Sequence, residues 1–311
     1  MQYIAIILGM LLLIKGGEYL FQGSISLSIK LNIPKFIIGM TIVSFATSAP
    51  ELVVSVQSAI MGHSDLALGN IVGSNIANIA FVLGVVIFIS PMKIEKTFYN
   101  TDWPIMMGIT LLFFFLFKNN NDITRLEGWI LIFVLVCYLF FLLFFHKSLL
   151  ESQELNDKQN NKSYFKMFYL IIAGGFFLWL GSEVLIKGVI DLASSFGISE
   201  RIVSLSVVAF GTSIPELTTS IVAIVRKEKG ISIGNLIGSN IFDMLGVMGI
   251  TALISPIIVM DQSLFGDDFI WMLSFSFLLL PLLFINKKMT LGKLEGLILL
   301  GLYVIFIGRL F

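Results

Sequence analysis

The chain is poor in charge, histidine and cysteine. Only 13% of its 311 residues are charged, whereas soluble domains carry about a quarter. Lysine plus arginine equals aspartate plus glutamate at 20 each, so the basic surface that nucleic acid requires is not expected. The single cysteine, Cys137, excludes an internal disulfide, and its apolar neighbours predict a side chain facing lipid or the core. With two histidines and no His-Glu-x-x-His or serine–histidine pairing, we do not expect an enzyme.

Hydrophobic residues are abundant instead, at 57% of the chain. A membrane-spanning helix needs about 20 mostly apolar residues. Runs of this kind predict an all-α membrane protein with ten transmembrane helices. The predicted spans are Tyr3–Ser26, Phe36–Met61, Leu66–Ser90, Trp103–Phe117, Thr124–Phe145, Lys166–Ile190, Ile202–Val225, Ile231–Ser255, Phe269–Ile285 and Leu291–Phe311.

An internal repeat organises the chain. Ile33–Pro91 aligns with Ile198–Pro256 without a gap, at a constant offset of 165. The match includes Thr-Ser-x-Pro-Glu and Gly-Ser-Asn, which similarity between apolar helices does not explain. We therefore predict a five-helix repeat at residues 1–146, a cytoplasmic linker at 147–165, and a second five-helix repeat at 166–311.

Because each repeat has an odd number of helices, the two repeats should insert in the membrane in opposite directions. Inverted repeats are typical of transporters. Loops on one predicted side carry fourteen lysines and arginines and those on the other carry four; Lys15 and Lys187 lie within helices and complete the twenty. The basic side should be cytoplasmic. This places both termini outside a multi-pass plasma membrane protein.

The first repeated motif, Thr47-Ser48-Ala49-Pro50-Glu51, falls within a predicted span. A carboxylate there needs a partner, and Pro50 removes a helical donor so that nearby carbonyls can face a cavity. Hydroxyl, carboxylate and carbonyl oxygens suit hard cations such as calcium and sodium. The second repeat offers the same groups, at Thr212, Ser213, Pro215 and Glu216.

The following helix of each repeat carries a polar stripe with a spacing of four residues. Its members are Asn70, Ser74 and Asn78 in the first repeat, and Asn235, Ser239 and Asp243 in the second. Glycine pairs, such as Gly234 with Gly238, would allow close packing against the broken helix of the same repeat. We expect one site surrounded by Glu51, Glu216, Asp243 and Asn78.

Other polar residues have simpler interpretations. Glu18 and Glu183 should pair with Lys15 and Lys187 on their own helices. His63 should be solvated in a short loop.

Both repeated segments resemble the α-repeats of the cation/calcium exchanger superfamily, and the chain looks like a compact prokaryotic sodium/calcium exchanger. The resemblance implies calcium binding by the Glu51 and Glu216 carboxylates and the main-chain carbonyls of Thr47 and Thr212. It implies a middle position occupied by Asn78 and Asp243. It also implies neighbouring sodium sites that share both glutamates and add Ser48, Ser74, Ser213, Ser239 and the carbonyls of Ser44 and Ala209.

The resemblance further implies exchange of three sodium ions for one calcium ion, with the first and sixth helices sliding across a core of the second, third, seventh and eighth. Apart from these ions and the lipid bilayer, we expect no cofactor and no obligate protein partner. Ala46 stands where the second repeat has Gly211, and Ser44 stands where it has Ala209. A calcium/proton exchanger, a potassium-dependent sodium/calcium exchanger and a cation channel remain as alternatives.

Overall fold

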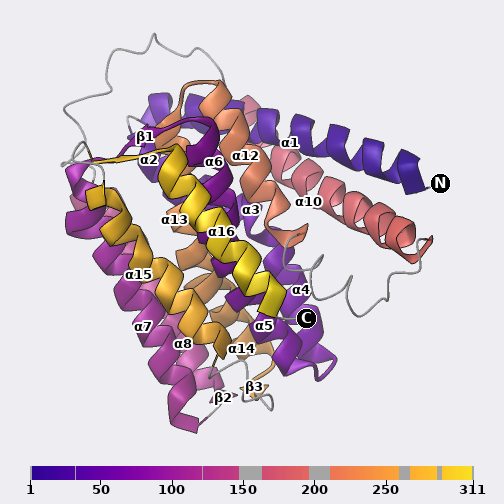
Figure 1. Cartoon of the computed structure of the whole chain (residues 1–311), viewed down its shortest axis with the longest axis vertical. Coiled ribbons are helices and arrows are strands. Elements are labelled where there is room, and N and C mark those ends of the chain that lie inside the picture. The colour runs from indigo at the N-terminus through magenta and orange to yellow at the C-terminus, as the bar shows by residue number, and fades with distance from the viewer. Residues whose placement is uncertain are drawn as a thin grey trace. The chain divides into compact units, whose positions relative to one another are not determined.

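The computed structural model describes residues 2–31, 33–120, 122–146, 163–195, 211–258, 267–285 and 289–309, and these are overwhelmingly helical (Figure 1). Among them, six helices are long and apolar enough to cross a membrane. A seventh crossing results if two segments bent by 43° at one break form a single span. Residues 202–210 of one predicted span, Ala209 among them, and residues 147–162 of the predicted linker lie outside the described part.

Contacts divide the chain into two units that do not follow chain order. The first unit contains Met1–Ala49 and Phe141–Gly238, and the second contains Pro50–Phe140 and Ser239–Leu310. Each unit therefore takes segments from both sequence repeats.

The first unit is built from long helices and from one end of each broken helix. Its described elements are α1 (Gln2–Leu31), α2 (Lys35–Ile38), the π-helical η1 (Gly39–Val43), α3 (Ser44–Thr47), η4 (Leu142–His146), α10 (Tyr164–Ser195), α12 (Ile214–Val225) and the start of α13 (Lys229–Phe242).

Helices α1 and α10 lie side by side and make the most extensive helix–helix contact of this unit (Figure 1). Glycines at seven-residue intervals line the contact; they are Gly9, Gly16 and Gly23 on α1, and Gly174, Gly181 and Gly188 on α10. A Cβ atom on Gly16 would lie 2.7 Å from the backbone nitrogen of Leu178. Glycine is therefore needed because the two backbones touch.

The described part of the second unit contains helices and short two-residue strands. Its elements are α4 (Ala49–Ile60), α5 (Ser64–Ile76), η2 (Ala77–Leu83), α6 (Gly84–Ile89), β1 (Met92–Lys93), η3 (Phe98–Asp102), α7 (Trp103–Asn120), β2 (Asp122–Ile123), α8 (Arg125–Phe141), η5 (Asp243–Val247), α14 (Met248–Ile254), β3 (Ile257–Ile258), α15 (Phe269–Ile285), β4 (Thr290–Leu291) and α16 (Lys293–Arg309). Strand β1 pairs antiparallel with β4, and β2 with β3, through Met92↔Leu291 and Ile123↔Ile257.

Helices α8 and α16 occupy equivalent places in the two repeats and begin in the same way. The Glu127 carboxylate accepts hydrogen bonds from the backbone N–H and the hydroxyl of Thr124, at 2.8 and 2.9 Å. The Glu295 carboxylate accepts one from the backbone N–H of Gly292 at 2.8 Å. These carboxylates satisfy amide groups that have no partner within the helix. The helix expected at Leu291–Phe311 consequently begins at Lys293, after β4.

The next residue of each helix is a glycine that packs on the other repeat. A Cβ atom on Gly128 would lie 3.0 Å from the carbonyl oxygen of Gly249 in α14. One on Gly296 would lie 2.8 Å from the carbonyl oxygen of Gly84 in α6. Because Gly84 and Gly249 are themselves repeat equivalents, the same helix contact is made twice, each time between repeats.

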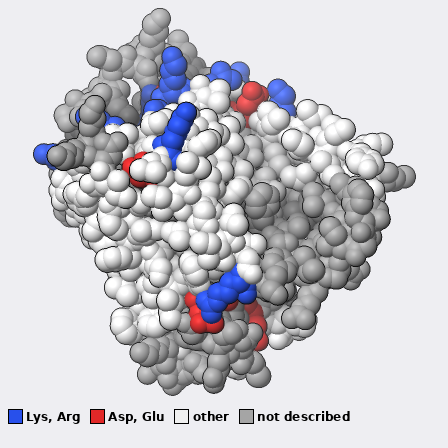
Figure 2. All heavy atoms as spheres, in the orientation of Figure 1, with Lys and Arg blue, Asp and Glu red and all other residues white. Residues whose placement is uncertain are grey.

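The surface suits a lipid environment. Large apolar side chains are exposed, among them Ile4, Leu126 and Ile172 at 70–71%. Figure 2 shows charged side chains in small groups separated by broad uncharged areas. Cys137 is exposed, in agreement with a lipid-facing side chain, and His63 is exposed in its loop as expected.

Candidate cation site

Both repeated Thr-Ser-x-Pro-Glu motifs break a helix at their serine. Ser48 (φ −78°, ψ 6°) and Ser213 (φ −85°, ψ 1°) leave the helical conformation in nearly the same way. The proline two residues later has no N–H, so the carbonyl four residues before it loses its helical donor. Each glutamate then stands in the first turn of the next helix, α4 or α12. The break predicted at Pro50 is confirmed, with a 43° bend.

The first unit holds Ser44, Thr47, Ser48, Thr212, Ser213 and Glu216, all buried. Here the start of α13 packs on α2, η1 and α3. The Ser44 hydroxyl donates to the main-chain oxygen of Asn235 at 3.0 Å, and the Thr47 hydroxyl donates to Asn235 Oδ1 at 3.2 Å. A Cβ atom on Gly238 would lie 2.7 Å from Met40 Cα. Gly234 and Gly238 therefore allow close helix packing as predicted, but against the broken helix of the other repeat and not of their own.

The partner of this stripe differs from expectation. We expected each polar stripe to face the broken helix of its own repeat. Asn235 instead contacts Ser44 and Thr47, which belong to the other repeat. A four-residue spacing identifies one polar face of a helix but does not say which neighbour covers it.

The second unit holds Glu51, Ser74, Asn78, Ser239 and Asp243, each with no exposed surface. In this unit the stripe does contact its own repeat. Asn70 Nδ2 donates to the main-chain oxygen of Glu51 at 3.3 Å and to Ser55 Oγ at 3.0 Å.

The structure brings two predicted ligands of this unit together across the repeats. Ser74 Oγ donates to Asp243 Oδ2 at 3.3 Å. The same oxygen accepts from Asn75 Nδ2 at 3.4 Å. Asn75 was not among the predicted site residues, although its place in the repeated Gly-Ser-Asn motif was a signal for it.

Asn78 and Asp243 lie in π-helical turns at equivalent positions of the two repeats. Asn78 is the second residue of η2, and Asp243 is the first residue of η5. Such turns are rare and often occur at functional sites, because they free backbone groups and redirect side chains. Hydrophobic periodicity gave no indication of them.

Several predicted site residues have buried side-chain atoms without a hydrogen-bond partner among the described residues. They are Ser48 Oγ, Thr212 Oγ1, Ser213 Oγ and both amide atoms of Asn78. Buried polar atoms are nearly always satisfied in folded proteins. Ser48 and Ser213 come three residues before the fully buried Glu51 and Glu216 in the sequence, and buried oxygen atoms of this kind fit ligands for a hard cation.

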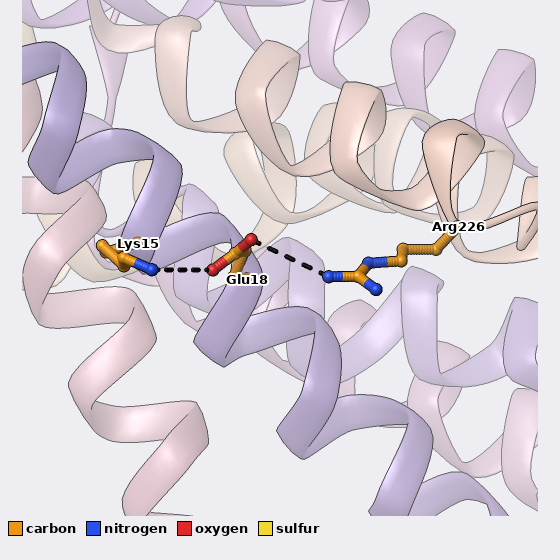
Figure 3. Close-up of polar contacts among 3 residues, drawn as sticks. All are labelled: Lys15, Glu18 and Arg226. Atoms are coloured by element: carbon orange, nitrogen blue, oxygen red, sulfur yellow. Dashed lines mark hydrogen bonds and ion pairs between the residues drawn. The ribbon is translucent and has the colours of Figure 1, made fainter.

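Glu18 and Glu183 contact basic side chains, as expected. Lys15 Nζ lies 3.2 Å from Glu18 Oε2, and Lys187 Nζ lies 3.7 Å from Glu183 Oε2. Glu18 also reaches Arg226 Nη2 at 3.8 Å, which links α1 to the end of α12 (Figure 3). These pairs are partly exposed and account for both glutamates without a cation.

A helical membrane protein with two similarly broken helices, each carrying a buried carboxylate and hydroxyls, is a membrane cation transporter in class. The chain belongs to the sodium/calcium exchanger protein family, whose model matches residues 1–144 and 166–311.

Relatives match this chain over nearly their full length. The sodium/calcium exchanger MaX1 of Methanosarcina acetivorans is 29% identical over 99% of this chain and 98% of its own length. The inner membrane protein YrbG of Escherichia coli is 31% identical, covering 98% of this chain and 95% of its own. A solved structure of the sodium-calcium exchanger NCX_Mj, soaked with 10 mM Na+ and zero Ca2+, superposes with a TM-score of 0.83. It is 29% identical and covers 100% of this chain and 99% of its own.

Proposed function

We propose that this protein exchanges sodium ions for calcium across the membrane by alternating access. Family membership supports this activity. The observation that carries it is the repeated helix break: Glu51 and Glu216 are fully buried, and the serine three residues before each, Ser48 and Ser213, has a buried hydroxyl without a hydrogen-bond partner among the described residues.

The oxygen ligands explain how one site can bind either calcium or sodium. Calcium takes about six to eight oxygen ligands, and two carboxylates supply charge equal to its own. We assign the Glu51 and Glu216 carboxylates and the Thr47 and Thr212 carbonyls to calcium. Sodium carries one charge, so several sodium ions are needed to replace one calcium ion at the same pair of carboxylates.

The sodium sites share both glutamates with calcium. Their further ligands are Ser48, Ser74, Ser213, Ser239 and the carbonyls of Ser44 and Ala209. Asn78 and Asp243 occupy the middle position. Because either ion set compensates the same carboxylates, sodium and calcium compete, and competition at a buried site couples their movements.

We further propose ten transmembrane helices in two inverted five-helix repeats, residues 1–146 and 166–311, joined by a cytoplasmic linker. The doubled contact of α8 with α14 and of α16 with α6 supports the repeat relation. Both termini face outside a plasma membrane.

Uptake of radioactive calcium into proteoliposomes tests the activity. Vesicles loaded with sodium and diluted into sodium-free buffer should accumulate calcium, and vesicles with equal sodium on both sides should not. Uptake driven equally well by a proton gradient would favour a calcium/proton exchanger. A requirement for potassium in the sodium-loaded vesicles would identify a potassium-dependent exchanger. Uptake without any opposing ion would indicate a channel.

A further inference from the structure

The hydrogen bonds at the two broken helices differ, although the residues that make them are repeated. Ser55 and Ser220 are equivalent at the offset of 165, and so are Asn70 and Asn235. In the first repeat, Asn70 Nδ2 donates to Ser55 Oγ at 3.0 Å and to the Glu51 carbonyl at 3.3 Å. Ser55 Oγ in turn donates to the Ala67 carbonyl at 3.4 Å. These bonds hold α4, the helix of Glu51, to α5.

The equivalent bonds are not made in the second repeat. Ser220 Oγ and Asn235 Nδ2 are buried, and neither has a hydrogen-bond partner among the described residues. Both belong to the first unit, as does Glu216. Among the described residues, the helix of Glu216 is therefore not held by the equivalents of the side-chain bonds that hold the helix of Glu51.

The two asparagine side chains form hydrogen bonds through different amide atoms, Nδ2 in Asn70 and Oδ1 in Asn235. Asn70 donates through Nδ2, and its Oδ1 has no partner among the described residues. Asn235 accepts from Thr47 through Oδ1, and its Nδ2 has none. Thr212, the repeat equivalent of Thr47, likewise has a buried hydroxyl without such a partner. Thus the side-chain bonds of Asn70 and of Asn235 each have a counterpart in the other repeat that is not made among the described residues.

We infer that Ser220 and Asn235 are positioning residues for Glu216 in a second conformation, in which Asn235 Nδ2 donates to Ser220 Oγ and to the Glu216 carbonyl. This inference rests on the proposed function: alternating access needs a second conformation, and in a protein of two inverted repeats that conformation can be made by each repeat adopting the arrangement of the other. In the second conformation the bonds of Asn70 to Ser55 and to the Glu51 carbonyl are released. The carboxylate whose helix is held thus alternates between Glu51 and Glu216.

Hydrogen exchange read by mass spectrometry tests the inference on the purified chain in detergent, free of sodium and calcium. The two peptides of interest cover Ala49–Ile60 and Ile214–Val225. Ser55→Ala should speed exchange in the first peptide and slow it in the second. Ser220→Ala should do the opposite. Each change should be about 2- to 10-fold, the shift in a two-state ratio that one net hydrogen bond produces.

The slowing in the opposite helix is the decisive sign, because a merely structural role would only speed exchange near the mutation. Thr219→Ala is the matched control: its hydroxyl is also buried without a partner among the described residues, but its repeat equivalent is Val54. It should leave the Ala49–Ile60 peptide unchanged, and Ser220→Thr should restore the wild-type pattern.

Faster exchange confined to the mutated helix, in Ser55→Ala or in Ser220→Ala, would overturn the inference. Ser55→Ala decides the matter alone if Ser220→Ala does not fold. Since the readout needs no transport, a failure of sodium-driven calcium uptake would count against the proposed function and leave this test intact.

Discussion

Ser74 donates its hydroxyl hydrogen bond to Oδ2 of Asp243, 3.3 Å away, and so links the polar stripe of one repeat to the only carboxylate in the stripe of the other. The equivalent position to Asp243 is Asn78, whose amide has no hydrogen-bond partner among the described residues. The middle of the candidate site is therefore chemically asymmetric. Two of the predictions below concern the carboxylates of the whole candidate site, Glu51, Glu216 and Asp243.

Glu51→Gln and Glu216→Gln should each lower sodium-driven calcium uptake by at least about 100-fold. Each change removes one of the two charges that compensate calcium in a buried site, and loss of one partner of a buried ion pair costs about 3–5 kcal/mol. Initial rates in proteoliposomes measure the loss. Glu127→Gln is the control, since that carboxylate caps α8 and glutamine can still cap. Near-normal uptake by either site mutant would refute the assignment.

Asp243→Asn should retain sodium/calcium exchange. We hypothesise that the Asp243 charge is spare during transport and is compensated by a proton or an additional cation. Asparagine can still accept the hydrogen bond from Ser74, so the fold should be kept. Without the carboxylate, inhibition at acid pH or dependence on potassium should weaken. Calcium uptake across a pH series, with and without potassium, measures both.

Asn78→Asp is the matched variant, because it places the extra charge in the other repeat. It should strengthen the inhibition at acid pH or the dependence on potassium, whichever Asp243→Asn weakens. A folded Asp243→Asn protein inactive at every pH would mean that the charged carboxylate is an obligatory ligand.

The termini and the loop at residues 119–122 should be reached from outside intact cells, and the linker at 147–163 should not. The distribution of lysine and arginine predicts this orientation. Single cysteines introduced into a Cys137→Ala background, labelled with an impermeant thiol reagent, test it. Removing Cys137 is necessary because it is exposed. Labelling of the linker alone would show the reverse orientation.

Gly16→Ala should destabilise the protein by about 1–3 kcal/mol, the range for an overpacked contact. The added Cβ would meet the Leu178 nitrogen at 2.7 Å and the Gly174 oxygen at 2.9 Å, and backbone atoms cannot move aside easily. Gly108→Ala is the control on α7, where an added Cβ meets nothing within 4 Å. It should be neutral or slightly stabilising, since alanine favours helix. Thermal unfolding in detergent compares the two, and equal effects would contradict a tight α1–α10 contact.

The sequence was informative where one residue changes the backbone by itself. Pro50 located a helix break because it lacks an N–H, and Gly234 indicated a close approach because it lacks a Cβ. The contacts of Asn235 could not be predicted, since its spacing fits any neighbour. The π-helical turns beginning at Ala77 and Asp243 were also missed. They differ from α-helix by one hydrogen-bond register, and apolar periodicity does not resolve so small a change.

The glycine contact between α1 and α10 has a mechanical consequence. The two helices come first in their respective repeats, and their backbones touch at both Gly16 and Gly181. We expect two helices in such close contact to move together as one rigid unit. If this unit slides so that it opens a passage on one side of the membrane, the same movement closes the passage on the other side. The seal against leakage of ions would then be a matter of geometry, and would not depend on the timing of two separate gates.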